Sequence, residues 1–257
     1  MRIIQAAVFS GALFFGVFLC LWIGWRIGQA RVRRDGEDSI TGFGALEGAI
    51  YALMGLLIAF TFTGAAQRFD HRRELIVDEV NAIGTAWLRL DLLESNARGH
   101  VKELFKQYLD ARIEAYAHID DNSILAAAVN RSAELQRDIW DRLVAAIDLD
   151  PRPRTATVVL PPVNEMFDLA NTRVLATQQH PPIAIYLMLG FLVLVSALLA
   201  GFGMAKAKRW SAIHVVGFAA IVSMAVYLIL DLEFPRLGLL RVNDFDRAFL
   251  ELRASMD

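Results

Sequence analysis

The sequence predicts an all-α membrane protein, with four transmembrane helices and a helical soluble bundle inserted between the second and third spans. Three observations predict this class. Apolar residues make up 56% of the 257 residues, yet 21% are charged, so the two kinds must be segregated along the chain. Four runs without charged residues are each long enough to cross a hydrocarbon core about 30 Å thick. Apolar residues elsewhere recur at three- and four-residue steps, and alternating strand patterns are nearly absent.

The four apolar runs define the expected organisation. Ile3 to Trp25 is uncharged, too long for a signal-peptide core and followed by no small-residue cleavage site, so we expect a retained span. Gly48 to Gln67 is the second run, and it continues into charged sequence without a proline. Residues 183–205 and 210–230 form the third and fourth runs. The expected parts are the first helix pair at 1–67, the soluble bundle at 68–180, the second helix pair at 181–231 and the tail at 232–257.

The insert has the pattern of an antiparallel helical bundle. Its apolar residues follow the helical period in three stretches, at 77–90, 101–113 and 139–147. The aromatic residues expected in its core are Trp87, Tyr108 and Trp140. Only Thr155 to Leu160 reads as extended, and Pro161-Pro162 predicts that a further helix begins at about Val163.

Charge excludes one class of partner but does not orient the chain. Residues 68–180 hold 14 Lys and Arg against 18 Asp and Glu, and the net charge of −4 argues against a nucleic-acid surface. Lys and Arg near the membrane ends number seven on each side, so the positive-inside rule gives no orientation. The single cysteine, Cys20, lies inside the first span and cannot form an internal disulfide.

No catalytic constellation is recognisable in the sequence. The five histidines are scattered, with no His-Glu-x-x-His pattern and no cysteine cluster for a zinc site. A Gly-rich phosphate loop and a Gly-x-Ser-x-Gly elbow are also missing. We therefore expect no enzyme, no catalytic residue and no cofactor. A polar site assembled between helices would leave no linear motif, so an enzyme or transporter stays open as an alternative.

Small residues follow one face of the second span. They recur at steps of three or four, at Gly48, Ala52, Gly55, Ala59, Thr63 and Ala66. Small faces let membrane helices approach closely, because helix association in lipid depends mainly on packing. One interpretation is ordinary contact within a subunit. In the other, the helix packs against copies of itself around an axis and leaves Leu56 and Phe60 at a narrow apolar constriction, which can gate ions by dewetting.

Charged residues flank the second span at both ends. Glu47 lies just outside it and could attract or select cations at a pore mouth, or it could be an interfacial residue of little cost. Three basic residues follow the span and could concentrate anions in a vestibule: Arg68, Arg72 and Arg73. Alternatively they pair along the same helix with Asp70, Glu74 and Asp78.

The segment from Arg68 to Asn81 resembles the one that follows the second transmembrane helix of bacterial bestrophins. There Arg-Trp-Trp is followed by a second Arg, a Leu and a Val-Asn pair at the same spacings, whereas Phe69-Asp70 replaces the paired Trp here. The chain is more closely similar to bacterial bestrophin-like membrane proteins of unknown function. They share the Glu-x-Asn-Ala-Ile-Gly block at 79–84 and the Leu-Asp-x-x-x-Pro-x-x-Gly end of the fourth span at 230–238.

The resemblance implies an oligomeric ion channel. Bestrophins are pentamers whose neck is lined by the second helix, and the matching positions counted back from Arg68 are Ala52, Leu56 and Phe60. Ala52 is smaller than the residue expected there, so the outer end of the neck would be wider. The resemblance further implies a bacterial inner membrane, contact with membrane lipid, and cytoplasmic termini and insert. The alternative function is a membrane-anchored scaffold or sensor whose bundle binds a partner without conduction.

The resemblance also raises the question of calcium. In animal bestrophins a calcium site uses acidic residues after the fourth helix, and the matching acids here are Asp231, Glu233, Asp244 and Asp246. Oxygen ligands suit calcium, which takes six to eight of them. Arginines interrupt the run of acids in this chain, at Arg236, Arg241 and Arg247. The alternative interpretation is a helix cap together with surface ion pairs.

Overall fold

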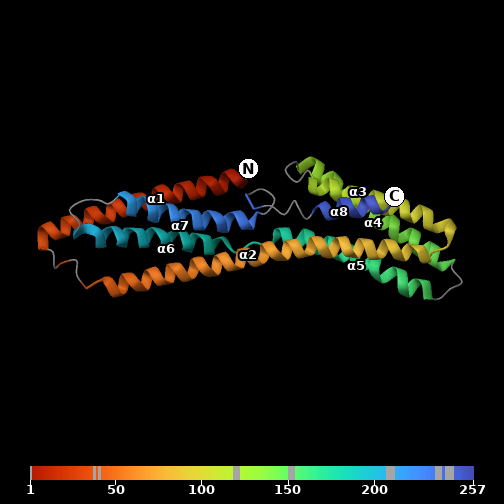
Figure 1. The fold of residues 1–257 in the computed structure, drawn as a ribbon, viewed down its shortest axis with the longest axis horizontal. Helices are drawn as coiled ribbons and strands as arrows, with labels where there is room; N and C mark the ends of the chain where they lie inside the picture. The colour runs from red at the N-terminus through yellow and green to blue at the C-terminus, as the bar shows by residue number, and fades with distance from the viewer. Residues whose placement is uncertain are drawn as a thin grey trace. The chain divides into compact units, whose positions relative to one another are not determined.

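The structure is a computed structural model that describes residues 2–36, 39, 42–117, 122–149, 154–206, 212–234, 239–240 and 246–257. These residues form α-helices and contain no strand, which confirms the all-α prediction (Figure 1). The helices are α1 (Arg2–Asp35), α2 (Gly44–Arg89), α3 (Ser95–Ala117), α4 (Asn122–Asp148), α5 (Arg154–Gln178), α6 (Ile183–Gly203), α7 (Ala212–Glu233) and α8 (Arg247–Ser255). Two short 3-10 turns, Leu90–Leu92 and Met204–Lys206, follow α2 and α6.

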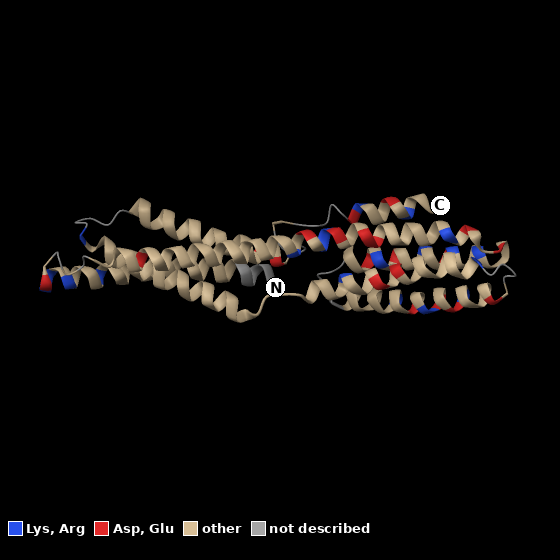
Figure 2. Ribbon diagram, turned by 90° about the horizontal axis from the view of Figure 1, so that it is seen from below, with Lys and Arg blue, Asp and Glu red and all other residues tan. Residues whose placement is uncertain are grey.

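Four helical stretches are long and apolar enough to cross a membrane. They are Ala7–Asp35, Gly44–Leu92, Arg154–Lys206 and Ala212–Glu233, and each overlaps one of the four uncharged runs, which confirms the prediction of four apolar helices of membrane-spanning length. Figure 2 shows few charged residues along these runs and many on the helices of residues 70–179. The chain is therefore a multi-pass membrane protein.

The chain divides into two compact units. The first contains residues 1–69 and 180–240, and the second contains residues 70–179 and 241–257. The division falls inside α2, which continues as one helix of 46 residues, as its unbroken sequence predicts.

In the first unit α1 packs against α6 and α7 around a buried apolar core. The contact between α1 and α6 is close enough for backbone to meet backbone. A Cβ atom at Gly24 would lie 1.9 Å from the carbonyl oxygen of Leu198, and one at Gly201 would lie 2.1 Å from that of Leu21. Only glycine fits at these two positions, as is common where membrane helices approach closely.

In the second unit α3 packs against α4, with Phe105, Tyr108 and Leu143 fully buried between helices. Trp87 packs its ring near that of Phe105 and is half-buried, as is Trp140. Of the three aromatic residues expected in the core, Tyr108 is therefore the one that is fully withdrawn from solvent.

The predicted start of α5 is wrong. The sequence suggested an extended stretch before Val163, but the helix already begins at Arg154 and contains Pro161 and Pro162. Thr155, Val159, Val163 and Met166 recur at helical steps on its buried face. Packing of this face outweighs the backbone hydrogen bonds that the two prolines cannot donate.

Candidate functional site

The three residues expected in a pore neck share an exposed face of α2. Leu56 is 51% exposed and Phe60 is 67% exposed, and Ala52 is exposed as well. Steps of four residues keep them on one side of the helix. In the most apolar stretch of α2 only 11% of the residues are buried, against 22% to 33% in the other three candidate spans. The chain's own spans thus leave this face of α2 uncovered.

Most of the small residues of α2 lie on the same uncovered face, whereas Ala66 is half-buried and packs against the apolar core of the first unit. Five of them are exposed, namely Gly48, Ala52, Gly55, Ala59 and Thr63. A Cβ atom built on Gly48 or Gly55 would have nothing within 4 Å. The interpretation of this stripe as a contact within one subunit therefore finds no partner at these two glycines among the described residues. The buried residues Met54 and Ala65 lie on the opposite side of the helix.

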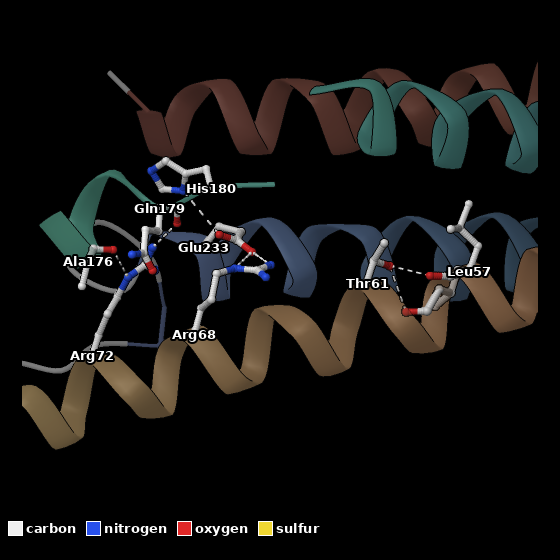
Figure 3. Close-up of polar contacts among 9 residues, drawn as sticks. Leu57, Thr61, Arg68, Arg72, Ala176, Gln179, His180 and Glu233 are labelled. Carbon is white, nitrogen blue, oxygen red and sulfur yellow. Dashed lines mark hydrogen bonds and ion pairs between the residues drawn. The ribbon is translucent and has the colours of Figure 1, made fainter. Parts of the chain in front are cut away.

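Arg68 binds a buried carboxylate (Figure 3). Its Nε lies 2.9 Å from Oε1 of Glu233, and its Nη2 donates to the same oxygen. The other carboxylate oxygen, Oε2, lies 3.3 Å from Nδ1 of His180. The side chain of Glu233 is only 1% exposed, at the last residue of α7. One acid thus links α2, α7 and the connection that precedes α6.

The other two basic residues have different surroundings. Arg72 is buried and donates to the carbonyl oxygens of Ala176, at 3.2 Å, and Gln179, at 3.0 Å (Figure 3). It therefore satisfies carbonyl groups at the C-terminal end of α5, which have no partner within the helix. Arg73 pairs with Asp70 at 3.1 Å, as the alternative interpretation of these residues expects. A vestibule formed by the three arginines stays a prediction.

Glu47 lies on a different side of α2 from the neck residues. A Cβ atom at Gly203 would lie 3.3 Å from its Oε2, so the carboxylate packs against the end of α6. Ala52 lies five positions after Glu47, which corresponds to about 140° around the helix. Its role at a pore mouth stays a prediction.

The acids near the C-terminus bind protein donors. Asp231 is buried, and its Oδ1 and Oδ2 accept the N–H groups of Leu239 and Leu240, each at 2.9 Å. Glu233 binds Arg68, and Asp246 accepts a hydrogen bond from Arg173 at 3.1 Å. Asp244 lies outside the described residues, as do Arg236 and Arg241. Among the residues that the structure describes, no group of three His, Cys, Asp or Glu side chains is placed to hold a metal ion.

A buried charge network in the second unit was not predicted. Glu79 is fully buried, with Oε1 2.7 Å from Nε of Arg112 and Oε2 2.7 Å from Nη1 of Arg173. Arg173 also donates a hydrogen bond to Asp246, and its guanidinium lies 3.6 Å from the ring centre of Tyr116. Two acids and two bases balance in charge.

The surroundings of Arg112 favour its charged form. Burial disfavours its charged form, but the hydroxyl of Tyr116 and the carboxylate of Glu79 outweigh burial and raise the pKa of Arg112. A signal for the network was present in the sequence. Glu79 lies at helical steps from the buried Ile76 and Ile83, and a charged residue on an apolar face requires a buried partner.

Comparison with known proteins identifies the family. The model of the bestrophin-like domain matches residues 11–244, a range that begins inside the first span and includes the other three spans and the insert. No curated protein matches the chain. No solved structure matches it. Because the match extends over most of the sequence, the chain belongs to the bestrophin-like family.

Proposed function

We propose that this protein assembles as a ring of identical copies and conducts ions through an axial pore lined by α2. The observation that carries the proposal is the uncovered face of α2, on which small residues alternate with Leu56 and Phe60. Membership of the bestrophin-like family supports an ion channel. By the resemblance to bestrophins we propose a pentamer in the bacterial inner membrane, with insert and termini in the cytoplasm and without enzymatic activity.

The small residues favour a protein partner over lipid on this face. The other spans expose mainly large apolar side chains, such as Phe15 on α1, Phe191 on α6 and Ile221 on α7, which suit contact with acyl chains. Glycines with open space beside them, such as Gly48 and Gly55, allow another helix to approach closely. Copies of α2 around an axis would cover these glycines.

The larger residues on the same face would form the constriction. Leu56 and Phe60 lie one helical turn apart, so in a ring they would form two successive apolar collars. A narrow apolar collar excludes water and thereby blocks ions until it widens. Ala52 lies one helical turn before Leu56, and its small side chain would leave the outer end of the pore neck wider.

Ion flux through the purified full chain in liposomes tests the proposal. We expect Phe60→Ala and Leu56→Ala to raise the flux, because truncation widens a collar and lets water enter. Phe191→Ala on α6 is the matched control, since Phe191 is also an apolar aromatic residue with 67% exposure, and it should leave the flux unchanged. The mass of the oligomer is measured on the same sample.

Two results would contradict the channel. One is a folded sample in which neither the native chain nor the truncated variants pass ions. The other is a monomer or dimer in lipid, which could not surround an axis with α2. Either result would favour the scaffold or sensor and direct attention to partners of the helical insert.

A further inference from the structure

Glu233 is an acid that its unit shields almost completely from solvent. Its side chain is 1% exposed, and the Arg68 side chain bound to it is 29% exposed. Both Nε and Nη2 of Arg68 donate to Oε1, while His180 contacts Oε2. A cation that is held by two donors on one buried oxygen has a fixed direction, because the guanidinium group is planar.

The part of α2 that belongs to the first unit, residues 44–69, makes few buried apolar contacts with that unit. Met54 and Ala65 are its buried apolar residues in the core of the first unit, and the others that reach this core are partly exposed. Within lipid the hydrophobic effect adds little between helices, so a sparsely packed helix turns easily about its axis. Within the first unit, the contact of Arg68 with the buried Glu233 therefore adds a directional restraint on the rotation of the helix.

The position of Arg68 relates this restraint to the neck. It lies eight residues after Phe60 and twelve after Leu56, which corresponds to about 80° and about 120° around an α-helix. No proline interrupts the helix between these residues, so their directions are coupled. Gly64, one turn before Arg68, leaves room for the guanidinium, since a Cβ there would lie 3.3 Å from Nη1.

We infer that Glu233 is a positioning residue which, through Arg68, fixes the rotation of α2 and keeps Leu56 and Phe60 directed away from the spans of their own subunit. The contribution to conduction rests on the proposed channel. The restraint itself is a property of one subunit and is measurable without flux.

Electron paramagnetic resonance on the full chain in lipid tests this restraint. Spin labels at positions 53 on α2 and 221 on α7, both exposed in the native chain, report the rotation of one helix against the other. The background is Cys20→Ala, and dilution with unlabelled protein suppresses distances between copies. We expect a narrow distance distribution for the native pair and a shifted or broadened one for Glu233→Gln and for Arg68→Gln.

The double variant separates positioning from general loss of stability. Because both substitutions break the same contact, Glu233→Gln with Arg68→Gln should shift the distances no more than either alone. Glu74→Gln, which removes an exposed carboxylate from the same helix, is the control and should change nothing. Should Glu233→Gln fail to fold, Arg68→Lys keeps the charge but loses the two-donor geometry, and it should still broaden the distribution.

Native distances in folded Glu233→Gln and Arg68→Lys would overturn the inference, as would additive shifts in the double variant. Flux measured on the same samples distinguishes this failure from failure of the channel. Shifted distances in a protein that never conducts would leave the restraint standing and reject the pore. Conduction by a protein whose distances do not shift would support the pore and reject the restraint.

Discussion

Glu79 and Arg173 form an ion pair of 2.7 Å in which neither side chain is more than 4% exposed. Removing one partner of such a pair leaves the other charge buried and unpaired. We therefore expect Glu79→Ala to lower the free energy of unfolding by about 3–5 kcal/mol, measured by chemical denaturation in detergent with circular dichroism. Asp70→Ala, which breaks the exposed pair with Arg73, should cost about 0–1 kcal/mol. Equal losses for the two variants would contradict a structural role for the buried network.

Tyr108 should make stability depend on alkaline pH. Burial raises the pKa of its hydroxyl above the ordinary value, so the unfolded chain releases this proton first. Its contribution is complete below about pH 10, where unfolded tyrosine titrates, and is lost as the pH rises toward the higher pKa of the folded state. We expect the native chain to lose stability more steeply than Tyr108→Phe as the pH rises above about 10. If the free energy of unfolding fell equally with pH in the native chain and in Tyr108→Phe, Tyr108 would not be the source of the pH dependence.

The contact between α1 and α6 should tolerate no side chain at Gly24. A Cβ atom there overlaps the carbonyl oxygen of Leu198, which belongs to the backbone and cannot turn aside. We expect Gly24→Ala to destabilise the first unit by about 1–3 kcal/mol, as overpacking does in other cores. Thermal unfolding in detergent measures the change. Gly11→Ala, also on α1 but with nothing within 4 Å of its Cβ, is the control and should unfold like the native chain.

The open glycines of α2 should matter for assembly and not for folding. Gly55→Leu adds a large side chain where the subunit itself has open space, so the unfolding of a dispersed subunit should change little. Between copies the same side chain would hold the helices apart, and we expect a smaller oligomer by mass measurement in lipid-like detergent. Gly11→Leu should retain the native mass. An unchanged oligomer in Gly55→Leu would remove the main support for a ring around α2.

The spans were predictable because the bilayer imposes a length. A hydrocarbon core requires about twenty apolar residues, and each of the four runs satisfies this requirement without reference to its neighbours. The beginning of α5 was not predictable from local sequence. Pro161 and Pro162 ordinarily mark a helix start, and only the packing of Thr155 and Val159 against the rest of the unit makes the earlier turns helical.

The candidate site was predictable only where helical spacing sufficed. The shared face of Ala52, Leu56 and Phe60 follows from steps of four residues. The partner of Arg68 does not, since Glu233 is 165 residues away in sequence and meets it only in the folded unit. Asp70, Glu74 and Asp78 lie closer to Arg68 in sequence, on the same helix. The acid that Arg68 binds is the one that the folded unit buries, Glu233, whose side chain is 1% exposed.

The unbroken course of α2 has a practical consequence for dissection of the protein. The boundary between residues 69 and 70 falls within this helix, so excision of the insert at that point creates a helix end whose first amide groups lack acceptors. An excised fragment would need an added N-cap residue such as Ser or Asp. Residues 179–182, where the chain returns to the first unit, are not helical and offer proteases an accessible bond. A single cut there yields two peptides with no covalent bond between them, and α2 keeps the insert attached to the first span pair in one of the two.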